Sequence, residues 1–148
     1  MVHTVAQTPF TEAYKAVNEY RQKFPQKAVT FYAQNYPAMG WAVFMAGGSC
    51  PVIPCTDKAF LKDAAAMEVE ETNTDEYKKM VKSDIGSIIY SKSGTEIPVQ
   101  LSSGKYVLKY IHPASGKIET INKLLKINGL YNLKVPDKKE GIYWFHKL

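Results

Sequence analysis

Apolar residues repeat with a helical spacing in the first part of the chain. In the segment 11–24, TEAYKAVNEYRQKF, they recur every three or four residues, which predicts an amphipathic helix ended by Pro25. The next segment, KAVTFYA at 27–33, is β-branched and aromatic, and this composition predicts a buried strand. The segment 38–46 is apolar on nearly every side and predicts a buried helix, which the glycine pair that follows would cap.

A shorter helix and an acidic stretch come next. The segment 57–67, DKAFLKDAAAM, predicts a helix with Asp57 as its N-cap. Residues 68–76 are rich in Glu and Asp and predict an exposed loop or linker, and a helical turn is expected at 77–81 within the same linker region.

From residue 85 onward the pattern becomes alternating, and turn residues separate short apolar runs. In 105–112, KYVLKYIH, Tyr106, Leu108 and Tyr110 fall on one face of a strand. Further strands are predicted at 87–91, 96–101, 117–121, 130–135 and 141–146. Short strands with regular turns and no helix between them favour an antiparallel β-sandwich.

Together these elements predict an α+β fold, in which an N-terminal helix–strand–helix element packs on a C-terminal antiparallel β-sandwich. We divide the chain into an α/β element at 1–68, an acidic linker at 69–84 and the sandwich domain at 85–148. A lone helix–strand–helix unit cannot form an open parallel sheet, because its strand needs neighbours. The first half is therefore either a piece of a larger sheet or an element supported by the β domain.

Composition agrees with a globular chain, since 45% of the residues are hydrophobic and 22% are charged. No apolar run reaches the ~18–20 residues of a membrane span, so no membrane span is expected. The N-terminal MVHTVAQTPF lacks the basic and apolar segments of a signal peptide.

The net charge of +5 raises the question of nucleic-acid binding. Lysines are scattered through the second half rather than clustered, and Arg21 is the one arginine of the sequence. Base recognition and bidentate phosphate contacts favour arginine, whereas scattered lysines protect strand edges and loops from aggregation. We therefore expect no nucleic-acid partner.

The most apolar stretch, GWAVFMAGGSCP at 40–51, is open to three interpretations: a buried helix, a phosphate-binding loop or a redox-active cysteine turn. A phosphate-binding loop places its glycines before a helix, but Gly47 and Gly48 follow the apolar run. Cys50 as a nucleophile would need a histidine brought close by the fold. The order of residues favours a buried helix.

The chain does not display a complete catalytic set. Cys50 and Cys55 have a C-x4-C spacing that is not a zinc pattern, and the three histidines are distant from one another in sequence, so we expect no metal or cofactor. Glycoside hydrolysis needs two paired carboxylates, and the acidic residues gather mainly in the stretch 68–76.

Two segments carry a resemblance to known proteins. FPQKAVTFYAQNYPAMGWAVFMAGGSCPVIP, at 24–54, resembles the last β/α unit of the barrel in bacterial apiosidase-like and other glycoside-hydrolase-like proteins. The second half, from GKYVLKYIHPASGKI to GIYWFHKL, is similar to the small β-sandwich that closes such chains and is often labelled a collagen-binding domain. The chain departs from that pattern at His112, where an acidic residue is common, and at Ser115, where threonine is usual.

The resemblance implies a non-catalytic C-terminal portion of a glycoside-hydrolase-like protein that acts on or binds polysaccharide. It also implies a secreted or periplasmic location. The alternative is a self-standing β-sandwich module that binds carbohydrate or protein. A barrel fragment would expose an apolar face and could self-associate through it. The candidate binding residues are Gln34, Asn35, Tyr36, Trp41, Tyr110 and His112.

Overall fold

The computed structural model of the chain describes residues 9–29, 37–49, 51–55 and 57–148. The chain divides into two compact units, residues 1–54 and 55–148. The fold class is α+β with a β-sandwich-like arrangement, as the sequence predicts. None of the helices in the described ranges is long and apolar enough to cross a bilayer.

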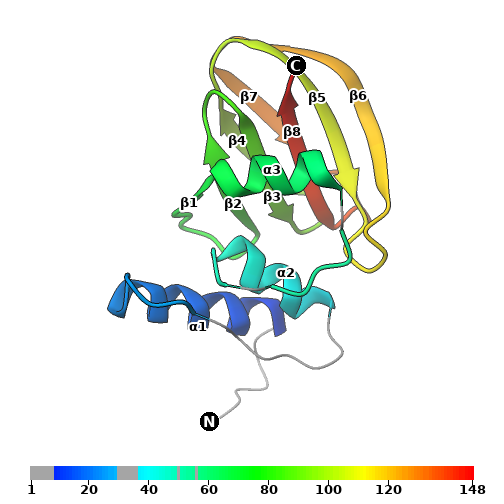
Figure 1. Cartoon of the computed structure of the whole chain (residues 1–148). Coiled ribbons are helices and arrows are strands. Elements are labelled where there is room, and N and C mark those ends of the chain that lie inside the picture. Colours follow the sequence, from blue (N-terminus) through cyan, green and yellow to red (C-terminus); the bar gives the residue numbers. More distant parts are fainter. Residues whose placement is uncertain (1–8, 30–36, 50, 56) are drawn as a thin grey trace. The chain divides into compact units, whose positions relative to one another are not determined.

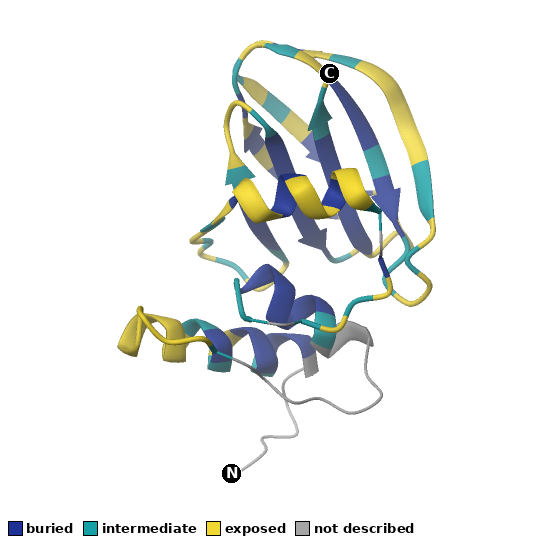
Figure 2. Cartoon of the chain, in the orientation of Figure 1, coloured by how far each residue is buried: buried dark blue, intermediate teal, exposed yellow. Residues whose placement is uncertain are grey.

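The first unit is built on two helices, α1 (Pro9–Lys23) and α2 (Pro37–Met45), which contact each other. The buried side chains of α1 lie at helical spacing, at Phe10, Ala13, Tyr14 and Val17. Figure 2 shows this stripe in dark blue, with intermediate residues between its members and exposed residues toward the C-terminal end of α1. Both predicted helices are confirmed, each with bounds one or two residues from those expected.

The end of α2 shows what the glycine pair does. Gly47 has a φ of 74°, a left-handed conformation that glycine adopts without steric cost. Its N–H donates to the carbonyl of Phe44 at 3.0 Å, and the N–H of Gly48 donates to the carbonyl of Val43 at 2.8 Å. These two bonds form a Schellman cap. The apolar residues 40–45 therefore lie in a capped helix whose side chains from Trp41 to Met45 are buried, as predicted.

The predicted strand at 27–33 is wrong over its first three residues. The N–H of Lys27 donates to the carbonyl of Phe24 at 3.0 Å, which closes a turn where the strand should begin. The carbonyl of Val29 accepts the N–H of Ser49 at 2.6 Å, and residues 27–29 are not assigned to a strand. Residues 30–33 lie outside the described residues.

The second unit begins with helix α3 (Lys58–Ala66). Asp57 is its N-cap, as predicted, because the Asp57 side chain accepts the N–H of Phe60 at 2.9 Å. The sequence division groups this helix with the preceding ones, but in the structure it belongs to the compact unit that contains the sheets.

Two antiparallel sheets make up the rest of the second unit (Figure 1). The larger has the strand order β1-β2-β3-β8-β5-β6 and the smaller pairs β4 with β7. The strands are β1 (Glu68–Glu70), β2 (Tyr77–Lys82), β3 (Gly86–Ser91), β4 (Glu96–Gln100), β5 (Gly104–Ile111), β6 (Ile118–Ile127), β7 (Leu130–Lys134) and β8 (Gly141–Lys147). The antiparallel strands predicted from residue 85 onward are confirmed.

The segment 68–82 differs from its prediction. The expected helical turn at 77–81 is strand β2, which pairs with β3 along its whole length, and β1 adds a short edge strand. The sequence did not indicate strand β2, because it contains two adjacent lysines, which are usually exposed. In the structure both Lys78 and Lys79 are buried. Lys79 Nζ donates to the carbonyl of Pro98 at 2.6 Å and lies 3.2 Å from Glu70 Oε2, so its charge is satisfied inside the sheet.

The hydrophobic core of the second unit lies between the two sheets. Its buried members come from β3, β4, β5, β7 and β8, together with the ends of neighbouring strands. Helix α3 lies across the other face of the larger sheet, as Figure 1 shows. There the ring of Phe60 packs edge-on against Trp144, with centroids 5.3 Å apart.

Candidate functional site

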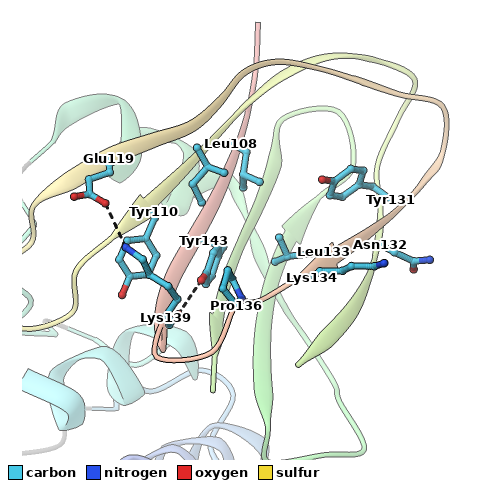
Figure 3. Close-up of a pocket in the computed structure, with 11 residues that line it drawn as sticks. Leu108, Tyr110, Glu119, Tyr131, Asn132, Leu133, Lys134, Pro136, Lys139 and Tyr143 are labelled. Carbon is cyan, nitrogen blue, oxygen red and sulfur yellow. Dashed lines mark hydrogen bonds and ion pairs between the residues drawn. The ribbon is translucent and has the colours of Figure 1, made fainter. Parts of the chain in front are cut away.

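A cavity of about 360 Å³ opens in the sandwich between strands of the two sheets (Figure 3). It is lined from β5, β6, β7, β8 and the loop between β7 and β8. The lining residues are Leu108, Tyr110, Glu119, Ile121, Tyr131, Asn132, Leu133, Lys134, Pro136, Lys139 and Tyr143. All of them belong to the second unit.

The edge strand β6 forms one wall of the cavity. Its pairing with β5 shifts register on both sides of Leu108, and the Asn122 side chain accepts the N–H of Leu124 at 3.0 Å. A local bond of this kind competes with the sheet ladder, and a bulge re-aims the side chains around it. Glu119 and Ile121, two residues apart on this strand, both line the cavity.

The floor of the cavity is largely apolar. Leu108, Leu133 and Tyr143 are buried core residues, while Tyr131 is only partly buried and packs edge-on against Phe145 with centroids 5.7 Å apart. Tyr131 therefore offers a partly accessible aromatic ring at the end of the cavity opposite Glu119 (Figure 3).

Two buried tyrosines hold the loop that forms the rim. The hydroxyl of Tyr143 donates to the carbonyl of Lys139 at 2.7 Å, and that of Tyr110 donates to the carbonyl of Glu140 at 2.7 Å. Burial raises the pKa of both hydroxyls, and the charges of Glu119 and Glu140 raise that of Tyr110 further. Both phenols therefore remain protonated donors, and the backbone at 139–140 is fixed.

A charged cluster lies at the Glu119 end of the cavity. Glu119 Oε2 lies 3.6 Å from Lys139 Nζ, and Glu119 Oε1 lies 3.2 Å from Nε2 of His112, a nitrogen that is shielded from solvent. The contact with His112, followed by the charges of Lys139 and Lys117, holds the pKa of Glu119 below its ordinary value. Glu119 is thus a compensated carboxylate at neutral pH.

Aromatic rings surround the same cluster. The Lys139 ammonium lies 4.8 Å from the centroid of the Tyr110 ring, a cation–π distance. The ring of His112 packs edge-on against that of Tyr110 with centroids 4.7 Å apart. Lys139 and His112 thus each contact both the Glu119 carboxylate and the Tyr110 ring.

The structure places two of the candidate binding residues at this cavity. Tyr110 lines it, and His112 adjoins it through Glu119 and Tyr110. Trp41 belongs to the first unit, where it is fully buried in α2 and packs against Phe44 with centroids 5.5 Å apart. Gln34, Asn35 and Tyr36 lie outside the described residues.

Sequence reasoning missed three residues of the site: Glu119, Tyr131 and Lys139. The available signal was the strand alternation, which places Glu119 and Ile121 on one face of β6 and Tyr131 on the same face of β7 as Leu133. The alternation does not say which strands are neighbours. The pairing of Tyr110 with Glu119 became visible only with the sheet register.

Other candidates for chemistry are limited in the described part of the chain. Cys55 is a free, buried thiol, and its burial raises its pKa, which makes it a poor nucleophile. Cys50 lies outside the described residues. No group of three potential metal ligands occurs among the residues that the structure describes.

Comparison with known proteins gives a partial match. A family model described as a domain of unknown function (DUF6298) matches residues 2–67, a little under half of the chain. No curated protein matches. A solved structure titled "Glycoside hydrolase" is similar with a TM-score of 0.40 and 15% identity, over 53% of this chain and 19% of its own. The chain thus spans about one fifth of that protein.

A second solved structure shows a weaker similarity. It is titled "Crystal structure of CapF with inhibitor 3-isopropenyl-tropolone", and it has a TM-score of 0.23 and 13% identity, over 94% of this chain and 44% of its own. The matched family has no assigned function, and both structural similarities are low. The function must therefore be argued from the cavity itself.

Proposed function

We propose that the second unit, residues 55–148, binds glycans through the β5–β8 cavity as a non-catalytic module of a glycoside-hydrolase-like protein. The observation that carries the proposal is the division of the cavity into an apolar floor with a partly accessible tyrosine ring and a polar, charged rim. The volume of about 360 Å³ lies within the usual range of small-molecule sites.

Sugar rings have the same two-sided chemistry. One face of a pyranose presents C–H groups that pack on aromatic rings, while hydroxyl groups around its edge need hydrogen-bond partners. Tyr131 supplies a ring, and Asn132 supplies both a donor and an acceptor. Lys134 and Lys139 add further donors at the rim.

The charge state of Glu119 favours binding over hydrolysis. A glycosidase needs a protonated acid with a raised pKa and a second carboxylate about 5–10 Å away. The pKa of Glu119 is lowered instead, and its oxygens already contact His112 and Lys139. Glu119 is also the one carboxylate among the described lining residues.

The first unit supports the idea that the chain works as part of a larger assembly. Tyr20 and Phe24 on α1 and just after it are 57% and 44% exposed, and their rings stack with centroids 6.3 Å apart. A stacked aromatic pair in water suits a surface that another protein element covers. Self-association through this pair is the alternative use of the same surface.

The proposal is tested by measuring glycan binding to the full chain by calorimetry. Tyr131→Ala should weaken binding by about tenfold, because a stacked aromatic ring contributes about 1.5 kcal/mol. Tyr20→Ala is the matched control, since it removes an exposed tyrosine that does not line the cavity. Unchanged affinity in Tyr131→Ala, or equal losses in both variants, would contradict the proposal.

A further inference from the structure

We infer that the cavity is selective for sugars that carry an N-acetyl group, and that the backbone N–H of Asn132 binds the carbonyl oxygen of this group. The inference rests on the proposed glycan binding and names the class of sugar. Its starting point is strand β7, which pairs with β4 in a two-stranded sheet. No other strand in the described part of the chain pairs with β7, so one side of its backbone is free.

The pairing with β4 determines which backbone groups of β7 are free. The N–H of Val135, just after β7, donates to the carbonyl of Thr95 at 2.9 Å, in register with the ladder. In an antiparallel pair, hydrogen-bonded positions alternate with positions whose N–H and C=O point the other way. Positions 135, 133 and 131 therefore bond toward β4, whereas Asn132 and Lys134 direct their N–H and C=O away from it.

The position of Pro98 in β4 agrees with this alternation. Pro98 lies opposite Asn132 in the register of the two strands, and proline has no N–H to donate. Within a sheet, proline is tolerated where the ladder needs no N–H from that position. The carbonyl of Pro98 accepts a hydrogen bond from Lys79 Nζ at 2.6 Å. Pro98 and Asn132 thus form a pair without mutual hydrogen bonds.

The free side of β7 faces the cavity. Residues 131–134 of β7 line the cavity, but none of the residues of β4, Glu96–Gln100, does so. The cavity therefore lies on the side of β7 that is turned away from β4 (Figure 3). Backbone N–H and C=O groups need hydrogen-bond partners, so a ligand that displaces water from them must supply partners of its own.

Apolar side chains lie beside these backbone groups. Leu133 follows Asn132 in β7, and Leu108 and Ile121 line the same cavity. A ligand that suits both features has a hydrogen-bond acceptor next to a small apolar group. An acetamido group has this arrangement, because its carbonyl carbon also carries a methyl group. A ring hydroxyl accepts the same N–H but buries no methyl group on the apolar floor.

A compact ligand suits this edge better than an added peptide strand does. Strand β7 is only five residues long, and Pro136 follows soon after its end. Glu119 faces the same cavity from β6. Proline and inward-facing charges are features that protect strand edges from further pairing. The edge therefore binds a substituent of a sugar, and strand pairing is the rival outcome of the test.

The experiment compares three probes by calorimetry with the full chain. The first is an oligomer of N-acetylglucosamine, the second is a glucose oligomer of the same linkage and length, and the third is an extended peptide of alternating valine and threonine. We expect the acetylated oligomer to bind about tenfold tighter than the glucose oligomer, because it adds a buried methyl and a better acceptor. Tyr131→Ala should weaken both sugars and keep this preference.

Amide hydrogen exchange measured by NMR then identifies the N–H. Exchange at Asn132 should slow by about fivefold or more when the acetylated oligomer is added. Leu130 is the matched control, because its N–H also lies on the free side of β7 but Leu130 does not line the cavity. Its exchange rate should not change. Equal slowing at both positions, or no slowing at Asn132, overturns the inference.

Two variants at one position test the same bond. Asn132→Pro removes the N–H without removing a hydrogen bond to β4, and it should abolish the preference for the acetylated oligomer. Asn132→Ala keeps the N–H and should keep the preference. Circular dichroism checks that each variant is folded, and the exchange measurement on the unmodified chain decides the question if Asn132→Pro does not fold.

The outcomes separate the inference from the proposed function. Equal binding of the two sugar oligomers, or a folded Asn132→Pro variant that keeps the preference, overturns the inference while glycan binding stands. No binding of either sugar, together with no binding of other glycans, overturns both. Tighter binding of the peptide than of the acetylated oligomer assigns the edge to strand pairing and also overturns the inference.

Discussion

At the scale of single residues, the site depends on polar groups whose partners are already inside the protein. The hydroxyls of Tyr110 and Tyr143 donate hydrogen bonds to the loop at 139–140. These tyrosines therefore shape the cavity rather than contact a sugar hydroxyl. The carboxylate of Glu119 likewise contacts His112 and Lys139. The lining groups that remain for a ligand are the ring of Tyr131 and the amide of Asn132.

The lowered pKa of Glu119 makes a prediction about pH. Its contribution to stability should be present above the ordinary value of 4.5 and disappear as the pH falls through the lowered value in the folded protein. Carbon-13 NMR of the Glu119 carboxyl should give a midpoint below 4.5. His112→Gln should raise that midpoint, because the contact with His112 is the largest cause of the shift.

The control for this titration is Lys92→Gln, which changes a lysine outside the cavity and should not move the midpoint. A midpoint that stays in place when His112 is replaced would show that the contact between its ring and Glu119 does not form in solution.

At the scale of elements, α3 contacts the sheet through a buried carboxylate as well as through the ring of Phe60. Asp63 Oδ2 accepts the indole N–H of Trp144 at 2.9 Å and lies 2.7 Å from Nδ1 of His146. Both partners are on β8, on the face that α3 covers, while Tyr143 and Phe145 point into the core. A single side chain thus joins a helix and a strand that are far apart in sequence.

Replacing this carboxylate should destabilise the second unit. Asp63→Ala leaves the buried indole N–H of Trp144 without its acceptor, and this should lower the free energy of unfolding by about 2 kcal/mol. Urea denaturation followed by tryptophan fluorescence measures the change. Lys62→Ala, one position earlier on the exposed face of the helix, should change it by less than about 0.5 kcal/mol. A similar small effect at both positions would contradict the role of Asp63.

Elements with one clean periodicity were predictable from the sequence, and others were not. The buried stripe of α1, the Asp57 cap and the apolar, β-forming run of β5 follow local rules, although β5 is buried on both faces. Strand β2 did not, because Lys78 and Lys79 are usually surface residues and only the carbonyl of Pro98 and Glu70 make Lys79 tolerable inside the sheet. Pro98 and Glu70 are not neighbours of Lys79 in sequence, so no local pattern predicts these contacts.

At the scale of the whole molecule, the division into two units does not follow the family match. The match at 2–67 ends after α3, whereas the compact second unit begins at Cys55 and includes that helix. The cavity was only partly predictable from the sequence. Tyr110 is recognisable in the alternating pattern of its strand, but Glu119 is brought to the cavity by the pairing of β5 with β6, and Lys139 by the loop after β7.

A pair of truncations tests where the second unit begins. Residues 55–148 should unfold cooperatively, whereas residues 68–148 lack Phe60 and Asp63 and should leave Trp144 uncovered. Trp144 is the one tryptophan in either fragment, so its emission should shift to longer wavelength in the shorter one. Identical emission maxima and melting temperatures would show that α3 is dispensable.

The edge strand β6 has a consequence for handling the protein. It carries Lys123 and Lys126 beside the exposed Ile121 and Leu124. Like charges keep two such strands from pairing with each other, and dissolved ions weaken that repulsion. Concentrated solutions of the protein should therefore stay clear in dilute buffer and turn cloudy as sodium chloride is added. This limits the salt concentration that can be used for crystallisation and NMR samples.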